Sequence, residues 1–446
     1  MATKLSFAQQ IKQKLCNSIS RLADDVSQFV KRPGKDFSRH RKLDFINCMR
    51  FIVSMEGSTL NKELLSFFQY ETDTPSASAF IQQRDKIKIS AFESLFHNFN
   101  RETPFQKLFH GYHLMACDGS DLNITRNPAD TETYHNAGTD GHSSLGYNLI
   151  HLNALYDLLE RRYAEAVLQP GRQKNEYRAF CDMMDRYSAE SVGKTIFIAD
   201  RGYCSYNVFA HAIENGEYFL IRSKDRDKKG MLSNLPLPTS PEFDVTVNLN
   251  LNRRNTKKLM NQPGINKFIG KDVDFDFVTP GSDDSYRMTL RIVRIQVSED
   301  SYECIITNLP PDEFPPSVIK ELYHMRWGIE TSFRELKYAV PLIRFHAKKR
   351  DYIEQEIWAR LILYNFCEII TTHVVISQSI NRIHTYQVNF TMGIHICHKF
   401  LRQLAGETPM KVKRLIRKYI LPVRPGRQYE RKIKFQKPSS FIYRIS

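Results

Sequence analysis

The sequence predicts an α/β core that is interrupted by an all-β insertion and preceded by an α-helical N-terminal domain. Three observations predict this arrangement. Apolar residues recur at helical spacing through the first hundred residues. From residue 111, short strand-like runs alternate with helical segments, which favours an α/β layer. Between residues 225 and 310, alternating runs are separated by Asn, Gly, Pro and Asp clusters, a pattern typical of hairpins.

The composition limits the classes to which the protein can belong. The chain has 446 residues, 41% of them hydrophobic, which is enough apolar material for several packed domains and excludes a largely disordered chain. Lys and Arg number 64 against 49 Asp and Glu, a net charge of +15. This surplus favours a phosphate-rich partner, although a generally basic enzyme is equally compatible with it.

Cysteine usage and the N-terminus predict a cytoplasmic protein. The eight cysteines are scattered without a C-x-x-C pair, so neither a zinc ribbon nor a disulfide framework is indicated. The first ten residues lack the apolar run of a signal peptide. The most apolar stretch, Ile353–Ile376, contains Glu356, Arg360 and Glu368, which indicates a buried helix instead of a membrane span.

Residues 1–105 are expected to form a helical domain that binds DNA ends. An apolar face runs from Phe7 to Phe29, and the runs Leu43–Met55 and Leu60–Phe68 follow it. Pro75 and the serines beside it start another helix. Two short helices joined by a polar turn can form a helix-turn-helix motif, with Ser76, Ser78, Gln82 and Arg84 facing DNA. The alternative is an ordinary helical bundle with a solvated polar face.

Residues 106–225 are expected to form the first part of the core. Strand-like and helical runs follow one another in the order strand, strand, strand, helix, strand, helix, strand. These runs are Tyr112–Cys117, Leu145–Leu155, Arg162–Leu168, Glu176–Tyr187, Thr195–Ala199, Val208–Glu214 and Tyr218–Arg222.

The rest of the chain divides into three expected segments. Residues 226–312 form the β-rich insertion, with alternating runs at Phe243–Leu251, Val273–Val278, Met288–Val297 and Tyr302–Leu309. Residues 313–400 form the second part of the core, which begins with a helix over Val318–Tyr338. Residues 401–446 form a basic tail suited to phosphate contact. Its basic side chains include Lys411, Lys413, Arg414, Arg417, Lys418, Arg424, Arg427, Arg431, Lys432 and Lys434.

Three acidic residues stand where a metal site can form. Asp118 and Asp200 each end a predicted strand, and the carboxyl ends of strands are where sites assemble in α/β sheets. Glu330 lies on the helix that follows the insertion. Carboxylates bind hard cations such as Mg²⁺, and a pair of such ions can activate the attack on a phosphodiester. Each residue also has a structural alternative, because Asp118-Gly119 suits a turn and Asp200 can cap a helix.

The helix that carries Glu330 has a second polar set on the same face. Tyr323, Arg326, Glu330 and Lys337 fall within an arc of roughly 60°, beside an apolar stripe for packing. The carboxylate suits a cation, while guanidinium and ammonium groups suit phosphate oxygens. An Arg326–Glu330 salt bridge on a solvated face is the alternative.

These motifs resemble those of bacterial DDE transposases, in the branch called insertion sequence family 4. The segment from Tyr323 to Lys337 is similar to the family's Y–R–E–K signature. The sequences Cys-Asp-Gly-Ser around Asp118 and Ala-Asp-Arg-Gly-Tyr around Asp200 are similar to its two aspartate motifs. The resemblance covers about residues 105–435 and implies a ribonuclease-H-like core, with a β-rich insertion between the second Asp and the Glu.

The resemblance also implies the activity and the roles of individual residues. Asp118, Asp200 and Glu330 are expected to bind two Mg²⁺ or Mn²⁺ ions and to be catalytic. The DNA contacts are expected at Tyr323, Arg326, Lys337, Arg334, Trp327 and Arg201. The partners are the terminal inverted repeats of the element and target DNA, bound by a homodimer. The reaction is cut-and-paste transposition, by cleavage at the element ends and transfer of the 3′-hydroxyl ends.

Two other functions remain open at this point. A nuclease of the same fold would cleave DNA without joining strands. A catalytically idle DNA-binding repressor would bind the ends without metal-dependent nicking.

Overall fold

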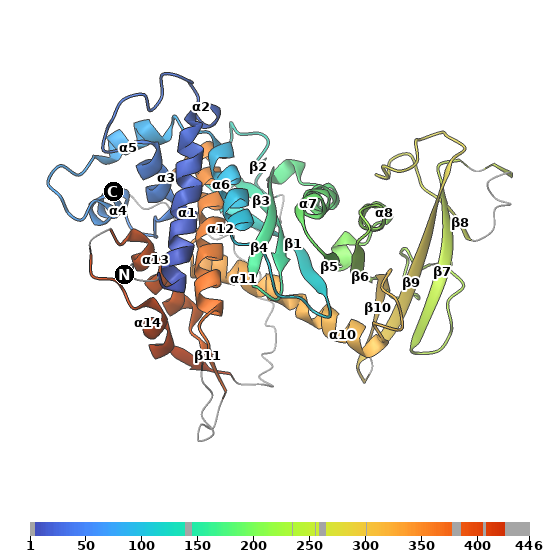
Figure 1. Cartoon of the computed structure of the whole chain (residues 1–446). Helices are drawn as coiled ribbons and strands as arrows, with labels where there is room; N and C mark the ends of the chain where they lie inside the picture. The colour runs from blue at the N-terminus through green and yellow to red at the C-terminus, as the bar shows by residue number, and fades with distance from the viewer. Residues whose placement is uncertain are drawn as a thin grey trace.

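The computed structural model describes residues 5–138, 145–233, 235–254, 256–257, 265–299, 301–376, 385–404 and 407–423. Two bodies lie side by side in it: a bundle of helices from both ends of the chain, and a long mixed sheet that extends away from the bundle (Figure 1). The five basic residues expected from Arg424 to Lys434 lie outside the described residues.

The helical body begins with the first six helices, which contain most of the predicted apolar runs. They are α1 (Phe7–Asp24), α2 (Val26–Phe29), α3 (Phe45–Val53), α4 (Leu60–Phe67), α5 (Ala77–Arg84) and α6 (Ile89–Glu102). Polar caps fix several starts: Ser6 caps α1 in a capping box, Asp44 caps α3, and Ser76 caps α5. The helices expected in this region are therefore present.

Helix α12 (Arg350–Thr372) is the centre of the helical body. It is buried along most of its length, and α1, α3, α6 and α13 (Phe390–Arg402) pack around it. Two of its buried acids form ion pairs inside the protein: Glu356 pairs with Arg84 at 2.8 Å, and Glu368 pairs with Arg161 at 3.1 Å. The predicted buried helix is confirmed, and within the described residues no helix is long and apolar enough to cross a membrane.

The sheet is built around β1 (Tyr112–Ile124). On one side, β3 (Tyr147–Asp157) pairs antiparallel with β1, and β4 (Arg162–Pro170) pairs antiparallel with β3. On the other side, β5 (Lys194–Ala199) is parallel to β1, and β6 (Tyr218–Ser223) is parallel to β5. This order agrees with the strands expected from the sequence.

Helices cover both faces of the central strands. Met115 and Phe197 face α7 (Glu176–Glu190) and α8 (Tyr206–Glu214), while Leu114 and Ile196 face α10 (Pro316–Met325). Side chains alternate between the faces of a strand, so a strand covered on both faces reads as a continuous apolar run. This explains the run from Thr195 to Ala199.

The segment expected as an insertion continues the same sheet instead of forming a separate one. Strand β10 (Ser301–Thr307) pairs antiparallel with β6, followed in the sheet by β9 (Ser285–Ser298), β7 (Phe243–Asn252) and β8 (Ile265–Phe268). The strand predicted at Val273–Val278 is wrong. Phe275 and Val278 are buried there as anchors of a turn-rich segment, and Asp276 binds His211 of α8 at 2.9 Å.

Short elements complete the described chain. They are β2 (Tyr134–His135), η1 (Gly171–Gln173), η2 (Arg201–Tyr203), α11 (Trp327–Tyr338), β11 (Tyr386–Val388), α14 (Val412–Lys418) and β12 (Ile420–Pro422). Strands β11 and β12 pair antiparallel with each other. The helix predicted over Val318–Tyr338 is divided at Arg326, where a tight turn separates α10 from α11.

The helix-turn-helix interpretation is wrong for Arg84, which does not face outward. Its side chain is 2% exposed and donates to Gln355 and Glu356 of α12, both at 2.8 Å. The sequence periodicity of α5 did not predict this burial, because Arg84 becomes buried only when α12 packs against this helix. Ser76, Ser78 and Gln82 are exposed.

We expect Arg84→Ala to lower the free energy of unfolding by about 3–5 kcal/mol, because the buried Glu356 would lose its guanidinium partner and keep only its contacts with His346. Arg101→Ala is the matched control, since the Arg101–Glu190 pair is more than half exposed and should contribute less than about 1 kcal/mol. Urea denaturation of both variants measures the difference; equal losses would contradict the structural role of the buried pair.

Candidate active site

The register of two parallel strands brings the two aspartates together. The last paired residues of β1 and β5 are Cys117 and Ala199. Asp118 and Asp200 come next in their chains, on strands about 4.8 Å apart. The expectation that Asp118 ends its strand is wrong, because β3 continues to pair with β1 as far as Ile124. The parallel pairing of β1 with β5 ends at Cys117. From Asp118 onward, the side of β1 that faced β5 is therefore uncovered.

Local backbone contacts orient both carboxylates. Asp200 caps η2, accepting from the N–H of Gly202 at 2.7 Å. A Cβ at Gly202 would lie 2.9 Å from that carboxylate oxygen, so the capped geometry favours glycine. Asp118 accepts from the N–H of Gly119 at 2.9 Å. The capping alternative for Asp200 is confirmed, whereas the turn alternative for Asp118-Gly119 is wrong because both residues lie within β1.

Helix α11 carries Glu330 along β1. Lys337, two turns after Glu330, donates to the carbonyl oxygen of Asp121 at 3.1 Å. Seven helical residues span about 10.5 Å and three strand residues span about 10 Å. Glu330 is therefore placed near the level of Asp118 when Lys337 is bound at Asp121. Lys337 therefore joins α11 to β1, in addition to the contact with phosphate that is expected of it.

The expected ion pair between Arg326 and Glu330 forms, at 2.9 Å, but not on a solvated face. The Arg326 side chain is 5% exposed and that of Glu330 is 32% exposed. The guanidinium is thus buried, whereas the carboxylate is partly exposed.

The three carboxylates affect one another electrostatically. The pKa of Asp118 is raised to about 6, chiefly by burial and also by the negative charges of Asp200 and Glu330, while the Gly119 N–H and the Arg326 charge oppose the rise. Within the described ranges, no three His, Cys, Asp or Glu side chains come close enough to hold a metal ion. Each carboxylate instead engages a donor of the protein, and the mutual repulsion of like charges favours that separation.

Donors without partners surround these acids. In the part of the chain that the structure describes, the hydroxyl of Tyr323 and the Nε atom of Arg326 are buried without a hydrogen-bond partner. Unsatisfied buried groups are unfavourable, and they are common at ligand sites. The chemistry of this set of residues suits a cation bound by the carboxylates. It also suits phosphate oxygens bound by these donors.

Arg222 belongs to the same site and was not predicted. Ile221 pairs with Ala199, so Arg222 follows at the level of Asp200 on the next strand. Its guanidinium binds Glu303 at 2.7 Å and lies 5.8 Å from the ring centre of Tyr323. The signal was available in the sequence, because the strand-end rule that selects Asp118 and Asp200 also applies to the end of the Tyr218–Arg222 run.

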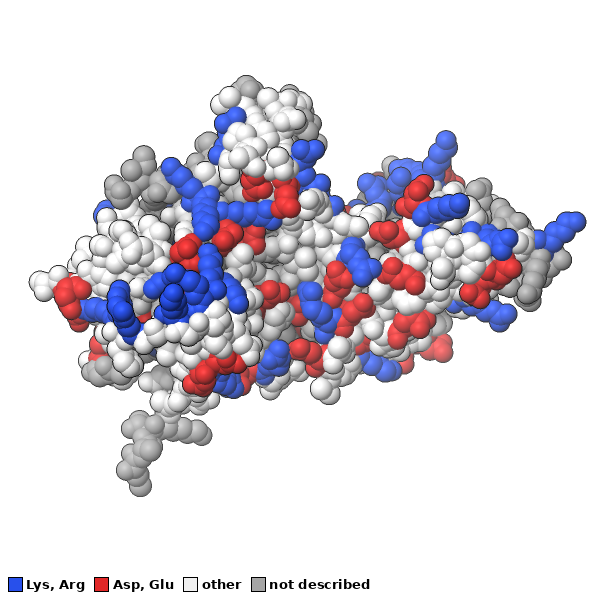
Figure 2. Space-filling view, turned by 90° about the horizontal axis from the view of Figure 1, so that it is seen from above, with Lys and Arg blue, Asp and Glu red and all other residues white. Residues whose placement is uncertain are grey.

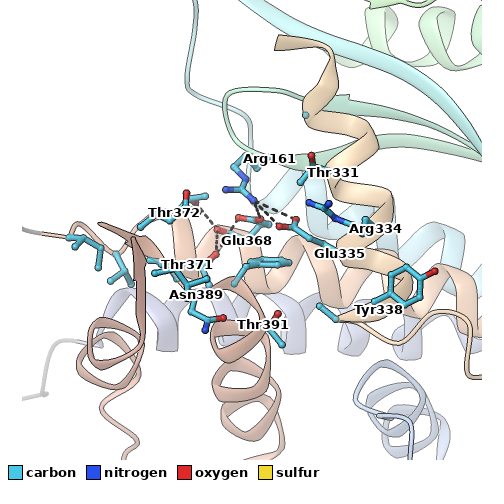
Figure 3. Close-up of a pocket in the computed structure, with 18 of the residues that line it drawn as sticks. Arg161, Thr331, Arg334, Glu335, Tyr338, Glu368, Thr371, Thr372, Asn389 and Thr391 are labelled. Atoms are coloured by element: carbon cyan, nitrogen blue, oxygen red, sulfur yellow. Dashed lines mark hydrogen bonds and ion pairs between the residues drawn. The ribbon is translucent and has the colours of Figure 1, made fainter. Parts of the chain in front are cut away.

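The other predicted DNA contacts, Arg201, Trp327 and Arg334, lie at the protein surface. Arg201 is exposed on η2, and Trp327 is 46% exposed at the start of α11. Arg334 lines a groove of about 880 Å³ between α11, the end of α12 and the start of α13 (Figure 3). Arg161 crosses the floor of that groove to Glu335 and Glu368, at 3.4 and 3.1 Å.

Comparison with known proteins agrees with this geometry. The family model described as the transposase DDE domain matches residues 110–366, which contain all three acids and Arg222. The chain belongs to the DDE transposase family. Family membership implies a ribonuclease-H-like α/β core, consistent with the mixed sheet and its helices, and members generally use divalent metal ions and act on DNA.

A curated relative supports the same branch of this DDE transposase family. Over 130 residues, the chain is 27% identical to the transposase InsG for insertion sequence element IS4 of Escherichia coli (strain K12). The match covers 27% of this chain and 29% of that relative. The resemblance to insertion sequence family 4 is thereby confirmed.

We expect Tyr323→Phe to leave the free energy of unfolding unchanged or to raise it by up to about 1 kcal/mol, because the hydroxyl that is lost has no partner in the free protein. The same change should weaken metal-dependent DNA cleavage if the hydroxyl makes the phosphate contact that is expected of Tyr323. Thermal denaturation and a cleavage assay on the same preparation test both effects. A clear loss of stability would show that the hydroxyl is bonded in the free protein.

Proposed function

We propose that this protein catalyses cut-and-paste transposition of an insertion sequence. It cleaves DNA at the element ends and joins the resulting 3′-hydroxyl ends to target DNA. The observation that carries the proposal is the β1–β5 register, which sets Asp118 and Asp200 at the open edge of adjacent strands, with Glu330 on a helix fastened to β1. The match to InsG supports the same activity.

Asp118, Asp200 and Glu330 are proposed to hold Mg²⁺ or Mn²⁺, as two ions in the active complex. When bound, the ions would supply charge for the attacking and leaving oxygens of a phosphodiester. The protein supplies the rest. Arg326, Arg222 and Tyr323 offer donors to phosphate oxygens, and the pairing of β1 with β5 fixes the backbone positions of Asp118 and Asp200.

Water or a 3′-hydroxyl group is the proposed nucleophile, so no side chain has to form a covalent intermediate. This agrees with the residues at the site. Cys117, which precedes Asp118, is fully buried, and burial raises the pKa of its thiol well above the ordinary value. It therefore packs in the core as a neutral side chain.

The helical region 1–105 is proposed to bind the element ends, through a basic segment at residues 31–42. This segment contains Lys31, Arg32, Lys35, Arg39, Arg41 and Lys42. A bridge between Val30 and Ile87 fixes its start. Among the described residues, Lys35, Arg39 and Arg41 are exposed and have no ion-pair partner. Seen from above, Lys and Arg side chains gather over the helical body (Figure 2).

The other domain boundaries are proposed as follows. Residues 106–225 and 313–400 form the two parts of the core, residues 226–312 form the β-rich insertion, and residues 401–446 form the basic tail. Lys411, Arg414 and Lys418 lie together at one surface of the described part of this tail. Two protomers are proposed to bridge the element ends and the target DNA in the bacterial cytoplasm.

We expect Asp118→Ala, Asp200→Ala and Glu330→Ala each to reduce Mg²⁺- or Mn²⁺-dependent cleavage of end DNA to background while DNA binding persists. Removal of the metal with a chelator should have the same effect on the wild type. Glu190→Ala, which removes an exposed acid paired with Arg101, is the control and should cleave normally. Cleavage by all three variants would overturn the assignment of the site. Strand joining to a target plasmid distinguishes a transposase from a nuclease.

We expect Arg39→Ala to weaken binding to DNA of any sequence and to reduce the slope of log K against log salt by about one, as for one lost phosphate contact. Lys62→Ala, an exposed basic residue on α4 outside the segment, is the control. Fluorescence anisotropy between 50 and 200 mM salt, the range over which phosphate contacts dominate, gives both slopes. An unchanged slope for Arg39→Ala would place the DNA elsewhere.

A further inference from the structure

A buried histidine lies directly beside the Asp118 motif. His151 of β3 is 2% exposed and pairs in register with Asp121 of β1. Its Nδ1 atom lies 2.6 Å from a carboxylate oxygen of Asp121, and its Nε2 atom lies 3.0 Å from Glu176 at the start of α7. The ring therefore joins β1, β3 and α7 at the level of the candidate active site.

The imidazole occupies the space that a side chain at position 119 would need. A Cβ built on Gly119 would lie 2.4 Å from Nε2 of His151 and 3.3 Å from the carboxylate of Glu176. The ring thus packs against the backbone of Gly119. That backbone also donates the N–H that holds the Asp118 carboxylate, at 2.9 Å. Displacement of the ring would free the segment that orients Asp118.

The contacts favour a charged ring. Nδ1 is hydrogen-bonded to Asp121 and Nε2 lies within ion-pair distance of Glu176, an arrangement that suits a protonated imidazole. Burial opposes this charge, but the bonds to Asp121 and Glu176 outweigh it and raise the pKa of His151 to about 8. Lys174 lies 3.7 Å from Asp121, and Lys337 of α11 donates to the Asp121 carbonyl. The cluster therefore also touches the helix that carries Glu330.

We propose that His151 is a positioning residue that holds the Asp118 carboxylate ready for the metal, by bracing Gly119 between Asp121 and Glu176. The inference rests on the proposed function, since it concerns the same site. Its consequence is that His151, which touches neither metal nor DNA in this account, sets metal affinity. Partners in this outer position typically change metal affinity or activity 10- to 100-fold when they are removed.

The chain contains a matched control for this role. His211 of α8 also lies between two carboxylates, 3.0 Å from Asp185 and 2.9 Å from Asp276, and is 8% exposed. Asp185 stands nine residues after Glu176 on α7, which is about 13.5 Å along the helix. Loss of either histidine leaves two acids without their shared partner, but only His151 supports the Asp118 segment.

The test compares His151→Ala with His211→Ala in the full-length protein. Free Mn²⁺ is titrated by electron paramagnetic resonance, and end-DNA cleavage is measured against Mn²⁺ concentration. We expect His151→Ala to raise the Mn²⁺ concentration for half-maximal binding and cleavage 10- to 100-fold, and His211→Ala to change both less than twofold. Equal shifts in both variants, or none in His151→Ala, would overturn the inference.

A second variant covers the case in which His151→Ala does not fold. His151→Gln retains a similar length and one amide donor but cannot bridge both acids, so it should fold and still bind Mn²⁺ more weakly than the wild type.

The pH dependence of stability in the wild type gives a further measurement. Because the pKa of His151 is raised from 6.5 to about 8, its contribution to stability is complete below pH 6.5 and is lost as the pH rises through 8. Thermal denaturation of His151→Gln should show less of this loss, and an identical profile would contradict the bridging contacts.

The outcomes also separate this inference from the proposed function. If the wild type binds no Mn²⁺ and does not cleave, the proposed function fails first. If the wild type cleaves and the three acids are required, but His151→Gln has wild-type Mn²⁺ affinity, the function stands and the positioning role is wrong.

Discussion

The parallel pairing of β1 and β5 is the constraint on which the site depends. A slip of one residue in this register would turn every side chain of β5 to the opposite face. The apolar residues of β5 prevent such a slip, because Phe197 and Ala199 pack under α7 and α8 while Ile196 and Ile198 pack under α10. Burial of ordinary core residues therefore fixes the separation of Asp118 and Asp200.

The third acid depends on a different set of contacts. Ser332 of α11 is hydrogen-bonded to Tyr163 of β4 at 2.9 Å, and Glu335 pairs with Arg161 in the β3–β4 hairpin. Arg161 has a φ of 59°, an unfavourable value for a residue with a side chain, and reaches from there to Glu368 of α12. The hairpin, α11 and α12 are thus joined by charged contacts. These contacts make the position of Glu330 sensitive to the helical body as well as to the sheet.

The site contains interactions that do not favour the free protein. Three carboxylates repel one another, and donors of Tyr323 and Arg326 are buried without partners in the described structure. Groups of this kind lower stability, and proteins retain them where a ligand satisfies them. Cations and phosphate groups supply the missing charge and acceptors. His151 in the same region lies within ion-pair distance of two carboxylates that the protein itself supplies, Asp121 and Glu176.

The sequence by itself determined the elements and the chemical type of the site. Strand-end acids, a helix with Arg326 and Glu330 on one face, and the long apolar helix could be read from local patterns, because apolar periodicity and strand ends are properties of short segments. Only the tertiary structure decided what depends on packing between distant segments. It buried Arg84 against α12, extended β1 beyond Asp118 through pairing with β3, and joined the strands near residues 243–307 to the central sheet. It also brought His151 to Gly119 and Arg222 to Tyr323, since such contacts arise from the pairing of strands and helices that are far apart in the chain.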